Sequence, residues 1–392
     1  MKNLIAITAT LSTMTALAGC SMNAEPSDYD SEESSSIDSI AQAVNTCAPS
    51  TEVYSFTSSS PYVIAKIGST EVARFTEGAY TVAVKGYTTR SFATTDTDGS
   101  AVNVTHDTYV RTLPAPFSSS MSDTDKTNWL LAAREANCHG DKDILAIANQ
   151  YAENAAETWV SGVRLMGDAD YGSGCDFHDY LCTSWTPPDG NPRPADLACQ
   201  ASLACPDPLA ASNIGSMDCS GFVRMVYGHR NNFEAQLPAY TASLGLSVFR
   251  YPLSTSQAPT HLPRASRNQY RYGSGMKVIP FRVASVPTQA EIDALQPGDL
   301  VFFNLDNTSA TCCEPSTPDE DDTCCEEGIT HVGIFVGEQG PREDRPTRYR
   351  LINSRDSMNG PTMGHTSFIN TSTSTKSSYS GWSAKLRAAR RF

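Results

Sequence analysis

The sequence predicts an α+β fold, in which a small all-β module precedes a larger domain with helices first and a mostly antiparallel sheet after them. From about residue 47 to 120, short runs such as "YVIAKIG" and "AYTVAVKG" are rich in β-branched and aromatic residues and are separated by Gly, Ser and Asp. The pattern changes to helical periodicity in "DKDILAIANQYAENAAETWV". Further on, "DLVFF", "HVGIFVG" and "YRLINS" are typical of strands. This order of elements indicates an α+β protein.

The N-terminus "MKNLIAITATLSTMTALAGC" has the pattern of a secretory signal. Lys2 precedes an apolar run over residues 4–18, which is too short to cross a bilayer permanently. The ending "LAGC" resembles a bacterial lipobox, so residues 1–19 are predicted to be removed and Cys20 to carry lipid. The alternative is an ordinary signal followed by a chance cysteine. Lipidation predicts an exported protein anchored to a membrane of the bacterial envelope, and Ser21 favours the outer membrane because it is not the aspartate that marks inner-membrane retention.

The rest of the chain divides by composition. Residues 20–46 are acidic, rich in serine and nearly free of large apolar groups, which predicts a tether rather than a folded segment. We assign residues 47–125 to the β module and residues 126–392 to the second domain, with insertions at about 229–290 and 306–329. The net charge of −14 argues against nucleic acid as a partner. We expect a monomer.

The cysteine count predicts one thiol among disulfides. Of the 12 cysteines, Cys20 is predicted to carry lipid and so to form no disulfide, which leaves an odd number. In an oxidising compartment an odd number indicates disulfides plus one spare thiol. Cys219 is the natural spare, because the others fall in close sets or in loop-like contexts. Candidate disulfide pairs, whose connectivity parity alone does not fix, are Cys175 with Cys182, Cys199 with Cys205, and Cys47 with Cys138.

The stretch "DCSGFVRMVYG" places this thiol at the start of a helix. Phe222, Val223 and Val226 recur at helical spacing after Cys219, and Gly228 is a natural helix end. In the first helical turn, backbone N–H groups and the helix dipole lower a thiol pKa and can hold an oxyanion. The alternative is a buried structural cysteine, but the odd count together with the helix-start position favours a nucleophile.

A thiolate nucleophile needs a base that holds its proton and returns it to the leaving amine. Of the 7 histidines, only His331 opens a compact apolar strand directly after a loop, and Gly333 leaves space beside its ring. His106, a lone histidine in a strand, is expected to be structural. The base also needs a polar partner that fixes its tautomer, and Asn353 lies one strand later. Neighbouring antiparallel strands would bring His331 and Asn353 side by side.

These residues resemble the NlpC-type cell-wall peptidases, which are papain-like bacterial cysteine hydrolases. The resemblance covers roughly residues 140–392 and rests on five motifs in family order: "DCSGFVRMVYG", "LQPGDLVFF", "THVGIFVGE", "LINS" and "GWSAKLRAARRF". It implies a papain-like catalytic domain with Cys219 as nucleophile, His331 as general base and acid, and Asn353 as the orienting third residue. The family often has histidine in this third place, and asparagine can also accept a hydrogen bond from the ring.

The resemblance also implies an oxyanion-side tyrosine ahead of the nucleophile. Tyr171 in "GDADYGSG" is preferred to Trp159 in "ETWVSG", because a phenol hydroxyl can donate to the oxyanion. The alternative for Tyr171 is a packing role. Asp218 and Ser220, which flank the cysteine, are further candidates for oxyanion or substrate contacts. The two insertions make the spacing between nucleophile and base longer than is usual in the family.

No metal or cofactor is expected. The paired cysteines in "DNTSATCCEPSTPDEDDTCCEEG" come without histidine and without C-x-x-C spacing, so disulfides that staple a loop are favoured over zinc. "DEDD" lacks the alternating ligand spacing of calcium loops.

The predicted function is hydrolysis of an amide bond, and the family resemblance implies peptidoglycan stem peptides as the substrate, cut at a bond such as the D-glutamyl–diaminopimelyl bond. One alternative is an amidase or acyltransferase that acts on another substrate, because folds of this kind host several such reactions. Another is a non-catalytic lipoprotein that binds the cell wall through its β module.

Overall fold

The computed structural model describes residues 49–95, 101–160, 163–172, 216–230, 266–282, 287–305, 328–340, 348–364, 367–368, 382 and 384–392. All of them belong to one compact unit, Ala43–Phe392. Two large antiparallel sheets, a two-stranded hairpin and several helices confirm the predicted α+β class. Within the described residues, no helix combines the length and apolar character that a membrane span requires.

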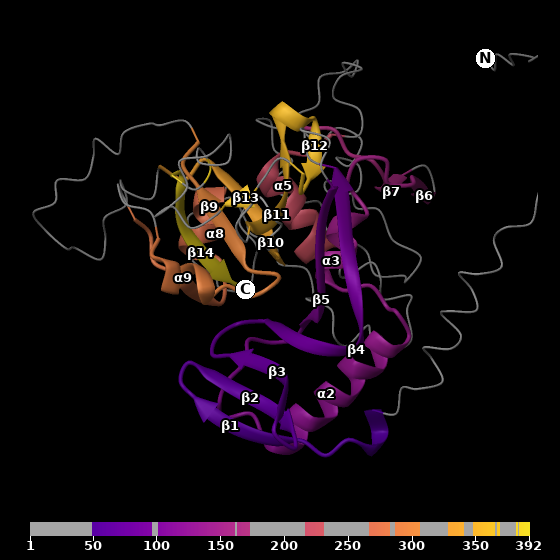
Figure 1. The fold of residues 1–392 in the computed structure, drawn as a ribbon, viewed down its shortest axis with the longest axis vertical. Helices are drawn as coiled ribbons and strands as arrows, with labels where there is room; N and C mark the ends of the chain where they lie inside the picture. The colour runs from indigo at the N-terminus through magenta and orange to yellow at the C-terminus, as the bar shows by residue number, and fades with distance from the viewer. Residues whose placement is uncertain are drawn as a thin grey trace, which may run out of the picture. The chain divides into compact units, whose positions relative to one another are not determined.

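The first sheet is a five-stranded antiparallel meander in the region of the predicted β module (Figure 1). Its strands follow chain order as β1 (Ser55–Ser59), β2 (Tyr62–Ile67), β3 (Thr70–Thr76), β4 (Thr81–Thr95) and β5 (Ala101–Thr112). Val63, Phe75 and Val84 are buried on one face and form part of its core. The antiparallel sheet predicted from the alternating runs is therefore confirmed.

A long helix, α2 (Asp123–Cys138), covers this face. It begins where the Ser122 hydroxyl accepts a hydrogen bond from the backbone N–H of Asp125 at 3.1 Å. The Trp129 ring meets the Phe75 ring edge-on at 5.5 Å between centroids. The predicted boundary between residues 125 and 126 thus falls in the first turn of a helix that shares a core with the first sheet, and the division into two domains stays a prediction.

The second sheet is antiparallel and has the strand order β12-β11-β10-β9-β14-β8, with β13 paired to β11. The runs "DLVFF", "HVGIFVG" and "YRLINS" form β9, β10 and β11, as predicted. The strand bounds are β8 (Met276–Ile279), β9 (Leu300–Phe303), β10 (His331–Gln339), β11 (Arg348–Arg355), β12 (Gly360–Thr362), β13 (Ser367–Phe368) and β14 (Leu386–Arg391).

The helical prediction for "DKDILAIANQYAENAAETWV" is wrong in its second half. Helix α3 (Ile144–Asn149) is short. The chain then turns through Asn154, whose φ of 64° lies in the left-handed region and cannot continue a right-handed helix. β-Branched residues follow and form strand β6 (Thr158–Val160), which pairs with β7 (Val163–Met166).

Helix α5 (Cys219–Arg224) begins at the predicted cysteine, but it does not end at Gly228. It widens into a π-helical turn, η5 (Met225–Arg230). The Tyr227 hydroxyl on this turn donates to the backbone carbonyl of Gly298 and anchors it in the core. The remaining helical segments are η1 (Pro49–Thr51), α8 (Ser266–Tyr272), α9 (Gln289–Asp293) and η8 (Asp356–Met358).

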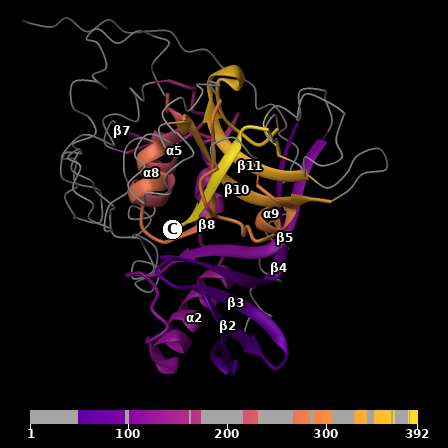
Figure 2. The same ribbon diagram turned by 90° about the vertical axis from the view of Figure 1, so that its left-hand side faces the viewer.

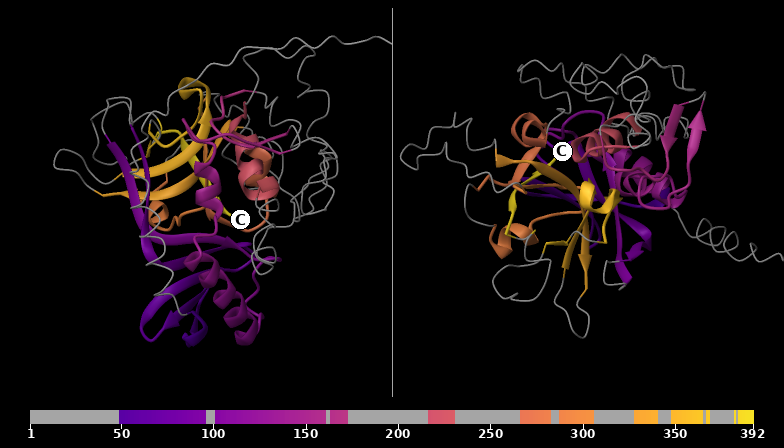
Figure 3. Two further views of the ribbon diagram at one scale, coloured as in Figure 1. Left: turned by 90° about the vertical axis from the view of Figure 1, so that its right-hand side faces the viewer. Right: turned by 90° about the horizontal axis from the view of Figure 1, so that it is seen from above.

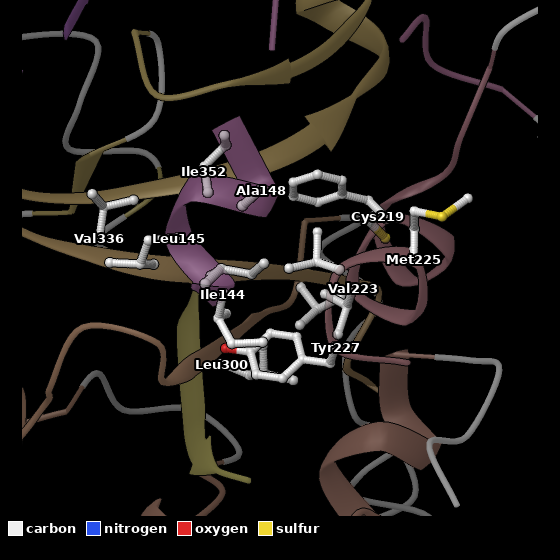
Figure 4. Packing of buried hydrophobic residues seen from close by; sticks show 14 of the residues in the cluster. Ile144, Leu145, Ala148, Cys219, Val223, Met225, Tyr227, Leu300, Val336 and Ile352 are labelled. Carbon is white, nitrogen blue, oxygen red and sulfur yellow. The ribbon is translucent and has the colours of Figure 1, made fainter. Parts of the chain in front are cut away.

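Helix α5 packs on β10 and β11 and lies beside α8 (Figure 2). Figure 4 shows side chains of α3 and of the α5–η5 segment meeting in one apolar cluster. From the sheet, Ile334 and Ile352 contribute to this cluster and form a cross-strand pair. A second cluster, which includes Phe335 and Leu351, lies on the alternate positions of the same strands and therefore on the other face.

The long β4–β5 hairpin joins the two sheets (Figure 3). The His106 Nε2 atom donates to the Val336 carbonyl on β10 at 3.0 Å, while its Nδ1 atom accepts from the Thr108 N–H at 3.1 Å. Two backbone bonds hold His106 in its neutral form, in agreement with the structural role expected for it. The Arg90 guanidinium donates to both oxygens of Asp143, at 2.5 and 2.6 Å.

Candidate active site

Cys219 is the first residue of α5, and the residues around it form a helix cap. The Asp218 carboxylate accepts from the Gly221 N–H at 2.6 Å and from the Ser220 hydroxyl at 3.0 Å. Gly221 permits this approach, because a Cβ atom there would lie 3.2 Å from the carboxylate oxygen. The short sequence "DCSG" therefore builds the turn that positions the cysteine. Asp218 and Ser220 both lie beside the nucleophile candidate, where Asp218 caps the helix and Ser220 donates to the capping carboxylate.

The Cys219 side chain is buried, with 7% of its surface exposed, and it is a thiol rather than part of a disulfide. The other described cysteine, Cys138, is disulfide-bonded. Its predicted partner, Cys47, lies outside the described residues, so that pairing stays a prediction. The predicted thiol at Cys219 agrees with the structure, and the predicted disulfide pairings stay predictions.

His331 opens β10 and is also buried. Burial lowers its pKa to about 3, and the Arg355 cation acts in the same direction, whereas Asn353 and the Asp218 carboxylate raise it. The imidazole is therefore neutral at neutral pH, which is the form that a general base requires. Its Nε2 atom has no hydrogen-bond partner within the described part of the chain.

Asn353 is completely buried on β11 and lies against the strand of His331. A Cβ atom at Gly333 would lie 3.1 Å from the Asn353 Cβ atom, so the missing side chain lets the two strands fit together here. Asn353 raises the pKa of His331 as a hydrogen-bonding neighbour does. Neither amide atom of Asn353, however, meets strict hydrogen-bond geometry with a described residue. The predicted neighbours His331 and Asn353 are thus adjacent, but no fully formed hydrogen bond joins them.

The nucleophile candidate is fastened to the same end of the sheet. Because β10 and β11 are antiparallel, the start of β10 and the end of β11 lie together. The Ser354 hydroxyl, next to Asn353, donates to the Met217 carbonyl at 2.6 Å. From the other side, the Gln269 amide on α8 donates to the Ser220 carbonyl at 3.0 Å. These two bonds hold the start of α5 at the edge of the sheet where His331 and Asn353 lie.

The segment that carries Tyr171 is also attached to this edge. Met217 N–H donates to the Asp170 carbonyl at 2.8 Å, and Gly172 N–H donates back to the Met217 carbonyl at 3.4 Å. Tyr171 lies between these two bonds and is half-buried. Its competitor Trp159 lies on the β6–β7 hairpin. The backbone contacts favour Tyr171, and the role of its hydroxyl stays a prediction.

Two further residues border His331 and were not predicted as functional. The Trp382 ring meets the imidazole edge-on at 5.2 Å between centroids. The Arg355 guanidinium carbon lies 4.7 Å from the centroid of the same indole. The sequence could have pointed to Arg355, because it follows Asn353 by two positions and so lies on the same face of the strand. It could not have pointed to Trp382, because only the tertiary fold brings this residue to His331.

No protein-family model matches the chain, and no curated protein matches it. Among solved structures, it is similar to a chain described as a novel NlpC/P60 endopeptidase from Photobacterium damselae subsp. piscicida, with 11% sequence identity and a TM-score of 0.20. The match covers 78% of this chain and 53% of that chain, which is about half the length of the similar protein. Such a low TM-score supports no inference, so the assignment of the site rests on its residues.

Several predicted features lie outside the described residues. They are the signal and tether, the lipidated Cys20, most of both insertions and the cysteine pairs of residues 175–205 and 312–325. Within the described ranges, no group of three or more His, Cys, Asp or Glu side chains is arranged to hold a metal ion.

Proposed function

We propose that the protein is a cysteine hydrolase that cleaves an amide bond in peptidoglycan stem peptides. One observation carries the proposal: a buried thiol begins a helix that is fastened to the sheet end where a neutral imidazole and a buried amide lie. This arrangement of helix and antiparallel sheet is also what a papain-like catalytic domain requires. The choice of stem peptides as substrate comes from the motif resemblance.

In the proposed reaction, the Cys219 thiol gives its proton to His331 and its sulfur attacks the carbonyl carbon of the scissile amide. Backbone N–H groups of the first turn of α5, assisted by the Tyr171 hydroxyl, stabilise the oxyanion. His331 then gives the proton to the leaving amine as the C–N bond breaks. Water, with His331 as base, hydrolyses the thioester and restores the thiol. Asn353 keeps the imidazole in one orientation.

The low pKa of His331 has a direct consequence for this reaction. In the substrate-free site the imidazole is neutral, because burial and the Arg355 cation oppose its protonation. Proton transfer from Cys219 places a thiolate beside the new imidazolium, and the attraction between the two charges offsets part of that penalty. The thiolate–imidazolium pair is therefore expected in the complex with the reacting substrate and not in the substrate-free site.

The cell-envelope context is part of the same proposal. A lipid on Cys20 would hold the enzyme at a membrane of the envelope, the outer membrane being favoured, and the acidic segment of residues 20–46 would extend it toward the wall. The first sheet would support the catalytic sheet through the β4–β5 hairpin.

Cleavage of purified muropeptides by the mature protein, followed by mass spectrometry, tests the proposal. Cys219→Ala and His331→Ala are each expected to lower turnover by on the order of 10³-fold or more. His139→Ala, which changes an exposed histidine whose ring bonds to Glu135, is the matched control and is expected to retain full activity. Unchanged cleavage by Cys219→Ala would remove the assignment of the nucleophile.

If the wild type cleaves no muropeptide but sediments with isolated cell walls, the protein is a binding lipoprotein instead. If it instead hydrolyses unrelated amides or esters, the broader amidase reading holds.

A further inference from the structure

We propose that Trp382 is the positioning residue for His331, so that the indole, and not Asn353, fixes the orientation of the imidazole before substrate binds. This inference rests on the proposed function, because His331 is a general base only if that function holds. Its structural basis is the set of ring contacts around His331, the anchoring of the indole and the incomplete hydrogen bonding between His331 and Asn353.

Three aromatic rings contact one another at the edge of the second sheet. The Trp382 ring lies edge-on to the His331 imidazole at 5.2 Å between centroids, and edge-on to the Phe303 ring at 4.8 Å. The centroids of the Phe303 and His331 rings are 6.4 Å apart. Phe303 is completely buried, and the pairing of β9 with β10 sets it opposite His331. The imidazole thus packs against an indole that itself packs against the core.

Hydrogen bonds fix the turn that carries Trp382. Within this turn, the Lys385 N–H donates to the Trp382 carbonyl at 3.0 Å. The Lys385 carbonyl accepts from the Asn304 N–H at 2.9 Å, and the Lys385 ammonium donates to the Leu305 carbonyl at 2.9 Å, both just beyond the end of β9. The Arg355 guanidinium carbon lies over the indole at 4.7 Å from its centroid. The indole is therefore a fixed support for its neighbour.

Hydrogen bonding among the described residues restrains the imidazole much less. The His331 Nε2 atom and both amide atoms of Asn353 are buried without a partner of good geometry there. Asn353 still raises the pKa of His331 as a nearby hydrogen-bonding group does. Hydrogen bonds weaken steeply away from good alignment, whereas close packing against a fixed ring leaves a buried side chain little room to turn. The orientation of the substrate-free imidazole therefore depends on Trp382.

The orientation matters because only a ring nitrogen can accept the Cys219 proton. The last torsion of a histidine side chain is broad, and a half-turn of the ring exchanges nitrogen and carbon positions. An unsupported ring would present a carbon to the thiol for part of the time. The indole removes this freedom in the substrate-free site. Asn353 acts later, when the imidazolium forms and its charge strengthens the hydrogen bond to the amide.

The order of the His331 ring, measured without substrate, separates the indole from the amide. NMR relaxation of isotope-labelled histidine rings gives this order, and His331→Gln identifies the signal. We expect the ring to remain as ordered in Asn353→Ala as in the wild type, and to become mobile in Trp382→Leu. Trp382→Phe, which keeps an aromatic ring, should retain most of the order. A ring that becomes mobile in Asn353→Ala, or stays ordered in Trp382→Leu, would overturn the proposal.

The kinetic effect of Trp382 should fall on kcat, because positioning alters the chemical step and not substrate binding. For muropeptide cleavage, Trp382→Leu is expected to lower kcat about 10- to 100-fold. KM should change by less than about threefold, and Trp382→Phe should recover most of the lost rate. A raised KM with unchanged kcat would make Trp382 a substrate contact and would overturn the positioning role.

The pKa of His331 provides a second readout in the same samples. Burial is the main cause that lowers this pKa to about 3, so a smaller side chain at position 382 should let it rise toward 6.5. The charged groups that act on the imidazole, Arg355 and Asp218, are unchanged in the variant. An NMR titration of the ring measures the shift, and an unchanged pKa in Trp382→Leu would contradict the packing of the indole on the imidazole.

Trp129→Leu is the matched control. Trp129 also meets a buried phenyl ring edge-on, that of Phe75 at 5.5 Å between centroids, but it does so in the core of the first sheet. Its substitution should lower the Tm and leave both kcat and the order of the His331 ring unchanged in the folded protein. A fall in kcat as large as that of Trp382→Leu would show a general effect of lost packing and would overturn the specific role of Trp382.

Measurement of ring order also distinguishes this inference from the proposed function, because it needs no cleavage. If the wild type cleaves no muropeptide, the proposed function fails. A ring that Trp382 orders and that does not respond to Asn353→Ala would still support the positioning role, and the reverse dependence would refute it even in an active enzyme. If Trp382→Leu does not fold, the ring in Asn353→Ala decides: an ordered ring supports the role of the indole, and a mobile ring refutes it.

Discussion

The substitution Gly333→Ala tests whether the fit between β10 and β11 positions the proposed catalytic residues. The added Cβ atom would lie less than 3.0 Å from the Leu351 Cδ1 atom, 3.1 Å from the Asn353 Cβ atom and 3.3 Å from the Ile352 carbonyl oxygen. Leu351 and Asn353 are completely buried, so neither can turn into solvent to make room. The strand that carries Asn353 must therefore shift away from the strand that carries His331.

Two magnitudes follow from this geometry. Overpacking by one methyl group in a closed core costs about 1–3 kcal/mol in the free energy of unfolding, which corresponds to a fall in Tm of on the order of several °C. A displacement of a catalytic group by a fraction of an ångström to 1 Å costs up to about 100-fold in rate. We expect kcat for muropeptide cleavage to fall about 10- to 100-fold at a temperature where Gly333→Ala is still fully folded.

Thermal unfolding and cleavage kinetics are measured on the same preparations, with Gly340→Ala as the control. Gly340 follows the other end of β10, and a Cβ atom there would contact nothing within 4 Å. Leu351→Val, which removes the Cδ1 atom, should reduce the stability penalty of Gly333→Ala in a double-mutant cycle. It should not restore the rate, because the contact with Asn353 remains. Full activity and unchanged Tm in Gly333→Ala would refute the argument.

Two further predictions concern buried charges. Asp143→Asn leaves the Arg90 guanidinium without its buried counter-charge, so chemical denaturation should show a loss of about 3–5 kcal/mol; a loss below 1 kcal/mol would contradict this. In the folded protein the pKa of His331 is lowered to about 3, so the unfolded chain binds this proton more readily. The contribution of the neutral imidazole to the free energy of unfolding is therefore complete above about pH 6.5 and is lost as the pH falls from there toward 3. The denaturation midpoint should therefore fall between pH 7.5 and 5.5, and His331→Gln should reduce that slope; an identical slope in the variant would contradict the assignment.

The local parts of the site were predictable from the sequence because local physics determines them. Cys219 precedes apolar residues at helical spacing, and Asp218 is a strong helix cap, so the helix start follows from neighbours within a few positions. His331 begins an uninterrupted apolar run, which predicts a buried strand. The sequence also pointed to Gly333 as a space beside the histidine, and the structure shows that Asn353 and Leu351 use that space.

The parts that were not predictable depend on contacts between distant segments. The helical pattern after Asn149 is interrupted because residues 158–160 gain strand pairing with β7, which outweighs their helical periodicity. Helix α2 shares its core with the first sheet through Trp129, and nothing in its own sequence specifies that partner. Trp382 reaches His331 from a position 51 residues later in the chain. Each of these outcomes is a tertiary contact that overrides or adds to a local preference.

The distribution of hydrogen bonds in the site indicates which half of it is rigid before substrate binds. The start of α5 is fixed by the Asp218 cap, by Ser354 and by Gln269, so the sulfur is positioned by bonds that do not involve the reacting atoms. On the strand side, His331 Nε2 and both amide atoms of Asn353 are buried without partners among the described residues. Each such atom costs about 1–3 kcal/mol, and a bond between the ring and the amide would remove that cost for two of them. Since a protonated ring makes this bond more strongly than a neutral one, formation of the imidazolium and ordering of Asn353 should occur together, in the reacting complex.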